Sequence, residues 1–390
     1  MVQIDYEVQL MINYPKATEI QQSIFIGTWD DKIPVYHVPS MHALNQLIGY
    51  MKHINSLNGT VLYRGQCELY RTVSPCILRD SELKDKNSGQ LEKVIDAFLK
   101  DKDIMKLLGF RKSQLNGWLL YEKCIVEAVL QHYGAKTFCV DFVDNHWTAL
   151  WFGLYRWDSD NNKYVERDIW EQDTGTEYIK RDIESQKKTL PKQPDPNSVT
   201  LTKNYIQELT QIAASTQQDF NALYNNALKR LYGKELSSWN QKYQKISEYN
   251  NAYEETINKL EQEAHLYLFL YVAETNADNI GGLYLGDNTY TIDLRKALPS
   301  VFLRPSSQHG WIVRGRSEEF DFNSRICCVI RINVSLVKTL LGNGKLLSQE
   351  NFFPNEKVDQ GYKRLLERQL DVDIKSKYKR IIPAGMIRRF

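Results

Sequence analysis

Residues 131–154 read QHYGAKTFCVDFVDNHWTALWFGL, and this stretch decides the fold of the central part of the chain. The apolar run 137–140 predicts a short buried strand that ends at Asp141. Asn145 then suits the N-cap of a helix. The apolar residues of that helix recur every three or four positions: Trp147, Leu150, Trp151 and Leu154. We therefore expect a strand that delivers Asp141 to a helix N-terminus, a common place for ligand-binding groups.

A structural interpretation of the same residues stays open. Asp141 and Asn145 could serve only to cap the helix, and His132 could fill a polar niche behind the turn. Spacing alone does not separate this interpretation from a ligand-binding one.

Composition places the chain among soluble globular proteins. Its 390 residues are 42% hydrophobic and 25% charged, with a formal net charge of +2. This balance argues against a dedicated nucleic-acid coat or a polybasic membrane binder. The longest apolar run, 266–273, is too short to span a bilayer, and no two cysteines form a C-x-x-C pair. We expect a cytoplasmic protein of two domains, or of one domain with a large insertion, without a membrane partner.

A second informative stretch, TVLYRGQ at 60–66, predicts a short strand that leads into Arg64 and Gly65. A glycine after the arginine leaves room for a ligand to approach the backbone. The guanidinium offers a planar fork of donors to a phosphate or a carboxylate. A surface turn gives the same pattern, so that alternative stays open. Residues 301–313, VFLRPSSQHGWIV, again place a polar side chain, Gln308, near a glycine and before a strand-like segment.

The composition changes between residues 156 and 263. Residues 156–200 are rich in Asp, Asn, Lys and Pro and predict a loosely ordered segment. Two helices are expected next, the first ending near Gly233. The second carries a heptad-like seam: Trp239, Tyr243, Ile246, Asn250, Tyr253, Ile257 and Leu260. We expect an inserted antiparallel helical hairpin, which either packs on itself or docks a partner such as an antitoxin or regulatory protein.

In their order along the chain, these motifs resemble those of the FRG-domain family, named for a Phe/Tyr-Arg-Gly motif. The resemblance covers about residues 40–155 and 264–370. It departs at Phe142 and Val143, where Trp and Thr are usual, and at Trp311, where Phe is usual. The matching residues are Tyr63, Arg64, Gly65, Gln131, His132, Tyr133, Gly134, Thr137, Asp141, Ala149, Phe152, Gln308 and Gly310.

The motif order is also similar, more distantly, to that of the ADP-ribosyltransferase superfamily. This resemblance implies that NAD is the substrate and that Arg64, Asp141 and Gln308 are the catalytic residues. Cleavage of the nicotinamide–ribose bond passes through an oxocarbenium-like state. It needs a cation near the pyrophosphate, aromatic faces for nicotinamide and acceptors for ribose hydroxyls. The residues expected to bind NAD are Tyr63, Gly65, His132, Tyr133, Trp147 and Trp311.

Gln308 lacks the negative charge that many such enzymes place in the late motif. Asp141 could supply that charge, or Glu318 or Glu319 could, or catalysis could be absent. No metal site is expected, because no cluster of Asp, Glu and His at close spacing occurs, and this also disfavours a nuclease.

The predicted fold is therefore α+β, with a mainly antiparallel split sheet resembling an ADP-ribosyltransferase core and an inserted helical hairpin. The expected parts are 1–155 and 264–370 for the core, 156–263 for the insertion, and 371–390 for a basic C-terminal tail. The predicted function is an NAD-dependent ADP-ribosyltransferase-like effector that modifies a protein or nucleic acid, in a bacterial toxin or anti-phage defence setting. The alternative is a non-catalytic nucleotide- or partner-binding module that docks through the hairpin.

Overall fold

The computed structural model describes residues 12–16, 19–79, 84–110, 119–158, 160, 163–169, 188–198, 200–260, 264–343, 347–355 and 357–367. The chain divides into two compact units. The core unit comprises residues 1–179 and 263–390, and the insertion unit comprises residues 180–262. The basic tail expected at 371–390 lies outside the described residues.

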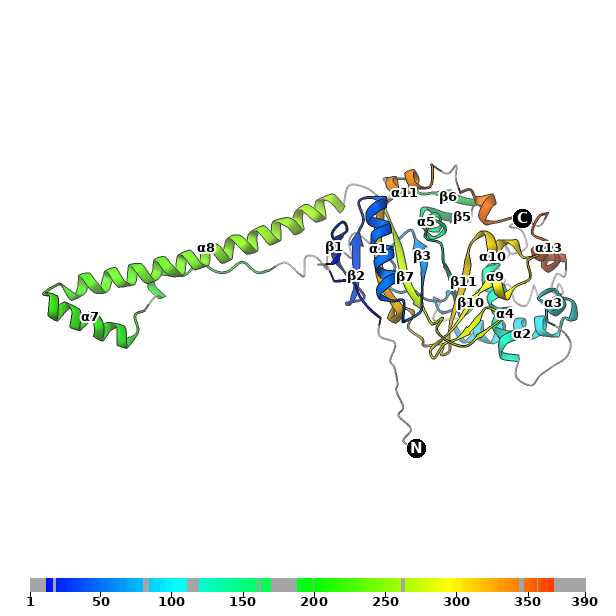
Figure 1. The fold of residues 1–390 in the computed structure, drawn as a ribbon, viewed down its shortest axis with the longest axis horizontal. Coiled ribbons are helices and arrows are strands. Elements are labelled where there is room, and N and C mark those ends of the chain that lie inside the picture. Colours follow the sequence, from blue (N-terminus) through cyan, green and yellow to red (C-terminus); the bar gives the residue numbers. More distant parts are fainter. Residues whose placement is uncertain are drawn as a thin grey trace, which may run out of the picture. The chain divides into compact units, whose positions relative to one another are not determined.

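The core unit is built on one large, mostly antiparallel sheet, so the expected mixed α+β class is confirmed (Figure 1). In the described residues the strand order is β1-β2-β12-β7-β3-β4-β11-β10-β9-β8. β2 and β12 are parallel, and the other described neighbours are antiparallel. The strands are β1 (Ile24–Trp29), β2 (Ile33–His37), β3 (Thr60–Gln66), β4 (Cys139–Val143), β7 (His265–Ala273), β8 (Asn279–Ile280), β9 (Leu283–Leu285), β10 (Thr289–Asp293), β11 (Gly310–Gly315) and β12 (Ile326–Asn333).

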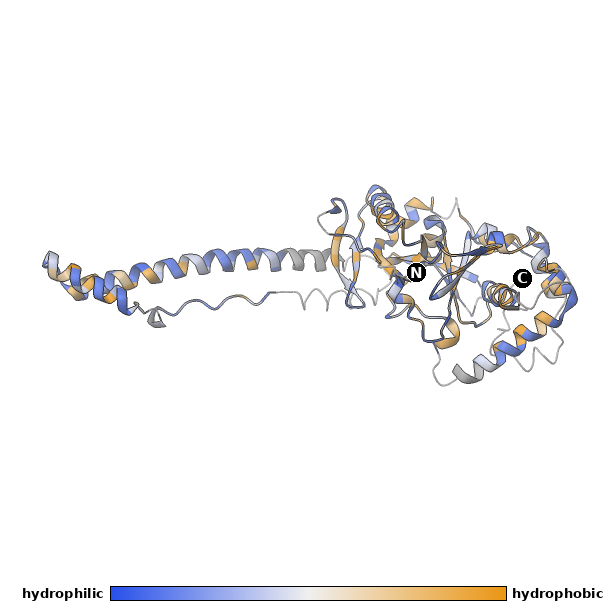
Figure 2. Ribbon diagram, turned by 60° about the horizontal axis from the view of Figure 1, so that its bottom comes forward, coloured by the Kyte–Doolittle hydropathy of each residue, from blue (hydrophilic) through white to orange (hydrophobic). Residues whose placement is uncertain are grey.

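Strand β7 lies in the middle of the sheet, and all nine of its residues are buried. Its sequence, HLYLFLYVA, is apolar on both faces, as expected for a strand covered on both sides. Its leucines at 266, 268 and 270 pack against helices α1 (Met41–Ile54), α5 (His146–Leu154) and α11 (Val334–Leu340). Figure 2 shows the hydrophobic residues concentrated in the centre of this unit.

A second hydrophobic cluster lies under the other half of the sheet. It is formed by α2 (Lys84–Lys100), α3 (Lys102–Leu107) and α4 (Leu119–His132), which pack against β4, β10 and β11. The N-cap expected at Asn145 is confirmed, since its side chain accepts a hydrogen bond from Trp147 N. The Ser40 side chain caps α1 in the same way and accepts a hydrogen bond from Ala43 N. The two clusters therefore support two halves of one sheet.

The two halves meet at β3 and β4, which are barely joined. In the described residues these strands share one residue pair, Tyr63 with Val143. In contrast, β3 pairs with β7 along its whole length, and β4 pairs with β11 along its whole length. The sheet therefore opens beyond Tyr63, at the position of Arg64 and Gly65.

Helix α5 packs directly against β3 at Gly65. A Cβ atom on this residue would overlap the Ala149 carbonyl oxygen and would lie 2.8 Å from Gly153 N. The glycine was expected to leave room for a ligand. On the side where its Cβ would lie, backbone of α5 occupies that room instead. Gly65 is required for the close approach of helix and strand.

Shorter elements complete the core unit. A two-stranded sheet of β5 (Tyr155–Asp158) and β6 (Lys163–Glu166) follows α5 directly, within the segment expected to be loosely ordered. The other helices in the described residues of this unit are α9 (Leu294–Ala297), α10 (Leu303–Ser307), α12 (Gln349–Phe352), α13 (Gln360–Glu367) and the 3₁₀ turns η2 (Cys76–Leu78) and η5 (Phe322–Arg325).

The insertion unit contains a helical hairpin, but of different helices from those expected. Helix α8 (Phe220–Leu260) continues through Gly233, so the predicted helix end there is wrong. Its partner is α7 (Lys203–Thr216), which packs on it through an apolar cluster that includes Leu209 and Ala227. Farther along α8, Trp239 Nε1 donates to the Pro191 carbonyl at 2.9 Å. Hydrophilic residues predominate along α8 (Figure 2).

In the described residues no helix has the length and apolar character needed to cross a membrane.

We expect Gly65→Ala to lower the free energy of unfolding of the core unit by about 3 kcal/mol or more, because the new Cβ meets helix backbone that cannot rotate away. Gly49→Ala in α1 is the matched control. Gly49 is exposed in a helix and a Cβ there meets nothing within 4 Å, so its substitution should stabilise by up to about 1 kcal/mol. Thermal and urea unfolding measure both, and equal stability of the two variants would contradict the packing argument.

Candidate functional site

A cavity of about 350 Å³ lies where β3 and β4 separate. Its volume is within the roughly 300–1,000 Å³ typical of small-molecule sites. The lining residues come from distant parts of the core unit: Tyr63, Arg64, Gly65, Gln131, His132, Tyr133, Gly134, Asp141, Phe142, Val143, Ala149, Phe152, Trp157, Tyr164, Arg304, Gln308, Gly310, Gln349 and Phe353. The structure therefore brings together seven predicted site residues: Tyr63, Arg64, Gly65, His132, Tyr133, Asp141 and Gln308.

Arg64 spans the opening between the two strands. Its Nη1 donates to the Asp141 backbone carbonyl at 2.8 Å. Its Nε is buried and has no hydrogen-bond partner in the described residues. Burial lowers the pKa of the guanidinium, an effect opposed by the nearby Asp141 carboxyl. Because a buried donor without a partner is costly, Nε is available to an anionic ligand.

Asp141 is held by a chain of polar side chains. Gln131 Nε2 donates to Asp141 Oδ2, and Thr137 Oγ1 donates to Gln131 Oε1 at 2.6 Å. Burial raises the pKa of Asp141, while the Gln131 hydrogen bond and the Arg64 charge act in the opposite direction. Gln131 and Thr137 thus position the carboxyl group of the strand, a role that the turn motif alone did not reveal.

His132 and Tyr63 add two further orphaned polar atoms. His132 Nε2 and Tyr63 Oη are buried and have no hydrogen-bond partner in the described residues. Burial lowers the pKa of His132 to about 3, with a further contribution from the Arg304 charge and an opposing hydrogen bond to the Arg304 backbone. The imidazole is therefore neutral near pH 7. Since Nε2 is not the nitrogen bonded to that backbone, it can accept a hydrogen bond from a ligand.

Gln308 and Arg304 reach the cavity from α10 and the residue after it. Gln308 is buried, and its Nε2 donates to the Phe352 carbonyl at 2.8 Å. Arg304 is 4% exposed, and its guanidinium carbon lies 4.6 Å from the centroid of the Tyr133 ring. Burial lowers the pKa of Arg304. Arg304 lies in the stretch 301–313 singled out from the sequence, but no site role was predicted for it.

Two of the predicted NAD-binding residues, Trp147 and Trp311, are not among the described residues that line the cavity. Trp147 packs against the cluster under β7, with its ring 4.7 Å from that of His146. On β11, Gly310 faces the cavity, since a Cβ there would meet the His132 ring. Successive residues of a strand point to opposite faces, so Trp311 points away.

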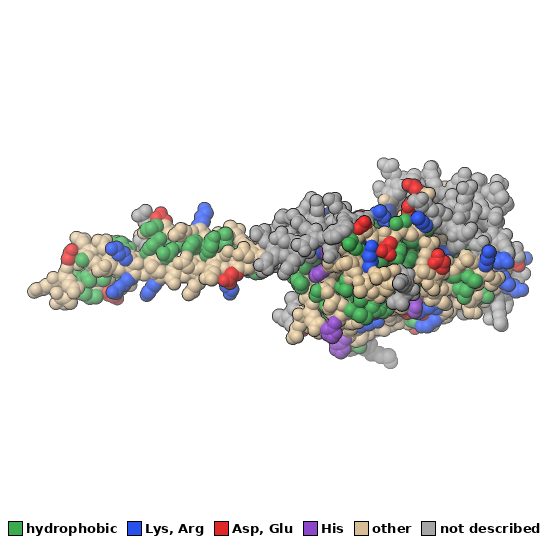
Figure 3. All heavy atoms as spheres, turned by 90° about the horizontal axis from the view of Figure 1, so that it is seen from above, with side chains coloured by type: hydrophobic (Ala, Val, Ile, Leu, Met, Phe, Trp, Pro, Cys, Tyr) green, Lys and Arg blue, Asp and Glu red, His purple; other side chains and the backbone are tan. Residues whose placement is uncertain are grey.

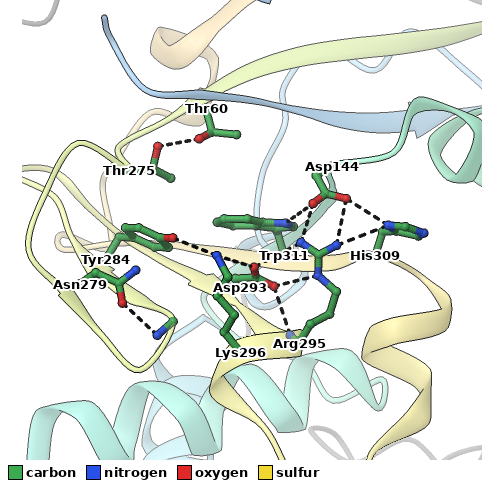
Figure 4. A network of polar contacts seen from close by, with 11 residues as sticks. Thr60, Asp144, Thr275, Asn279, Tyr284, Asp293, Arg295, Lys296, His309 and Trp311 are labelled. Atoms are coloured by element: carbon green, nitrogen blue, oxygen red, sulfur yellow. Dashed lines mark hydrogen bonds and ion pairs between the residues drawn. The ribbon is translucent and has the colours of Figure 1, made fainter. Parts of the chain in front are cut away.

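Trp311 belongs instead to a polar network on that other side (Figure 4). Its Nε1 donates to Asp144 Oδ2 at 3.2 Å, and its ring stacks on Tyr284 with centroids 5.8 Å apart. Asp144 is also paired with Arg295 and lies 3.2 Å from His309 Nδ1. These mutual contacts link β4 to α9 and β11.

The aromatic residues Trp157, Tyr164 and Phe353 also line the cavity, although none of them was predicted as a site residue. The first two belong to the β5–β6 hairpin, within a stretch whose polar composition predicted loose order. Alternation of Tyr155 and Trp157 is the signal that could have identified its first strand.

Acidic residues other than Asp141 do not reach the described lining. Glu318 and Glu319 are exposed and are not among the lining residues. No group of three or more His, Cys, Asp or Glu residues in the described ranges could hold a metal ion. On the face seen in Figure 3, Lys and Arg side chains are interspersed with Asp and Glu.

Comparisons of this chain with protein-family models, with curated proteins and with solved structures find no match.

The low pKa of His132 predicts an acid-sensitive contribution to stability. Because the pKa in the folded state lies below its ordinary value of 6.5, this contribution is complete above pH 6.5 and is lost as the pH falls from 6.5 toward 3. The wild-type protein should therefore lose up to about 1.4 kcal/mol more per pH unit than His132→Asn between pH 6 and pH 4.

Urea unfolding at several pH values measures the difference, and the other histidines are common to both proteins. The exposed His42 of α1 provides the control variant His42→Asn. Parallel pH profiles for the wild type and His132→Asn would show that His132 is not held neutral by burial.

Proposed function

We propose that this protein is an ADP-ribosyltransferase-like enzyme that cleaves NAD and transfers its ADP-ribose group to a protein or nucleic acid. The observation that carries the proposal is the cavity between β3 and β4. It gathers Arg64, Asp141 and Gln308, the three residues that the motif resemblance implies. The FRG-domain resemblance, and with it a role as a toxin or anti-phage effector in the cytoplasm, is part of the same proposal.

The polar atoms of the cavity fit a nucleotide such as NAD. Arg64 Nε is a buried donor without a partner in the described residues, suited to a pyrophosphate oxygen. His132 Nε2 is an acceptor, suited to a ribose hydroxyl or to the nicotinamide amide. Arg304 adds a second positive charge to the lining. A ligand that carries both phosphate and hydroxyl groups would bind Arg64, His132 and Arg304 together.

The reaction breaks the bond between ribose C1′ and the nicotinamide nitrogen. The bonding electron pair stays with nicotinamide, which leaves as a neutral molecule, while positive charge develops on the ribose. A nucleophile of the target then bonds to C1′ and releases its proton to solvent. Asp141 is the acid that lines the described cavity, and its carboxylate would stabilise the positive charge of the ribose.

A second candidate is nucleotide binding without turnover. It is favoured by Gln308, whose amide donates to a backbone carbonyl instead of presenting a carboxylate to the cavity. In this case a partner docked on the insertion unit would use the nucleotide-bound state.

We expect Arg64→Ala to reduce kcat/KM for NAD by roughly 10- to 100-fold, the effect of losing a hydrogen bond to a charged group. Arg64→Lys should recover little, because an ammonium carries all its donors on one nitrogen and cannot reproduce the separate Nη1 and Nε positions of the planar guanidinium. Nicotinamide release, with and without cell extract, is the measurement. Arg71→Ala, at an exposed arginine in the segment after β3, is the control.

Release that Arg64→Ala leaves unchanged would refute the site assignment. Absence of release, with NAD still raising the melting temperature, would favour the non-catalytic candidate.

Asp141→Asn separates catalysis from stability. Since burial raises the pKa of Asp141, its contribution to stability is present below the ordinary pKa of about 3.9 and is lost as the pH rises through the raised value. The variant should therefore melt higher than the wild type at pH 7, by about 2 °C for each 1 kcal/mol gained, and the gap should narrow in acid.

Nicotinamide release should nevertheless fall at least about 10-fold in Asp141→Asn, as when one charged stabilising group is removed from a transition state. A variant that melts lower at pH 7 and keeps full activity would contradict both roles of Asp141.

A further inference from the structure

The outer part of the cavity is an aromatic wall, which we define as Trp157, Tyr164 and Phe353. The Tyr164 and Phe353 rings are stacked, with centroids 4.8 Å apart and planes 23° apart. The Trp157 ring meets Tyr164 edge-on at 5.1 Å. All three line the cavity and remain partly exposed.

The inner aromatic rings of the cavity are already covered by protein. Tyr63 is fully buried, and Phe142 packs against Tyr271 with centroids 4.5 Å apart. Tyr133 stacks on Tyr362 at 5.1 Å, with planes 7° apart. A planar ligand therefore finds accessible ring surface at the aromatic wall, not at these inner rings.

A buried cation adjoins the wall. The Arg304 guanidinium carbon lies 5.3 Å from the centroid of the Phe353 ring. Its backbone is fixed as well, because Arg304 N donates to Asp359 Oδ2 at 3.1 Å. The wall thus combines flat apolar surface with a positive charge, the two features that nucleotide-binding surfaces use for bases and phosphates.

The polar neighbours of the wall hold it in place. Gln308 Nε2 donates to the Phe352 carbonyl, which fixes the chain just before Phe353. Gln349 Oε1 accepts from Tyr164 N at 3.2 Å, which ties α12 to the β5–β6 hairpin. With its oxygen engaged, Gln349 can offer its amide group to an acceptor on a ligand.

We propose that the aromatic wall is a stacking subsite for the base of a phosphorylated nucleotide, with Arg304 binding the phosphate beside it. The subsite deepens the proposed function, since it rests on NAD being the nucleotide that the enzyme uses. Base stacking and phosphate binding are common to the adenylate and nicotinamide halves of NAD, and the test distinguishes them.

The experiment is a calorimetric titration of the full-length protein with each of three compounds: AMP, nicotinamide mononucleotide and ribose 5-phosphate. The two nucleotides carry a base, and the third compound has the same phosphate without one. We expect Trp157→Leu and Tyr164→Leu to weaken binding of one nucleotide by roughly 10-fold or more. Affinity for ribose 5-phosphate should not change. Tyr164→Phe keeps the ring and should bind as the wild type does.

The matched control is Trp239→Leu in the insertion unit. Trp239 lies 5.0 Å from the ring of Tyr243, much as Trp157 lies beside Tyr164, but it is outside the cavity. A variant Arg304→Lys should weaken the nucleotides and ribose 5-phosphate together, because it alters the phosphate contact and not the stacking surface. The nucleotide that responds to Trp157→Leu identifies the half of NAD that stacks on the wall.

The subsite is overturned if neither nucleotide binds more tightly than ribose 5-phosphate, or if the wall variants bind both nucleotides as the wild type does. This outcome is separate from failure of the proposed function. Ring-dependent binding without nicotinamide release keeps the subsite and removes the transferase. If Trp157→Leu releases nicotinamide with an unchanged KM for NAD, the transferase is kept and the subsite is removed.

Discussion

The separation of β3 from β4 is the constraint on which the rest of the structure depends. Beyond the pair of Tyr63 with Val143, the backbone ladder stops, and the Arg64 side chain bonds the Asp141 carbonyl instead. An unsatisfied backbone carbonyl that is removed from water costs about 1–3 kcal/mol, so the guanidinium supplies the Asp141 carbonyl with a donor where β3 supplies none. The same side chain lines the cavity, and its buried Nε has no hydrogen-bond partner in the described residues.

The electrostatics of the cavity favour an anionic ligand over a neutral one. Burial lowers the pKa of Arg64 and of Arg304, so removal from water disfavours the charged form of both groups. The Asp141 carboxyl group offsets part of the Arg64 charge, but burial raises the pKa of Asp141. A phosphate brought near Arg64 would offset the free-energy cost of removing its charge from water, as a buried charge requires. Arg64 would therefore take part both in ligand binding and in the contact between β3 and β4.

Local sequence patterns predicted the elements of the core unit where one pattern dominated. Asn145 was identified as a helix cap because a short polar side chain precedes apolar residues at helical spacing. Gly233 misled the prediction, since a glycine costs only about 1 kcal/mol in a helix that extends far on both sides of it. The β5–β6 hairpin that contains Tyr164 was not predicted, because its segment is polar in composition. Tyr164 is fixed by stacking on Phe353, a residue distant in sequence.

The sequence was sufficient to predict which strands carry the site residues. It was not sufficient to predict the direction in which each side chain points. Arg64 and Asp141 meet because β3 and β4 are neighbours, whereas the face that Trp311 occupies depends on the register of β11. Gln308 illustrates the same limit. Its amide donates to the Phe352 carbonyl, and an ionised glutamate there would place an acceptor against an acceptor. The late-motif glutamine is therefore the residue that lets this chain anchor an aromatic wall over the cavity.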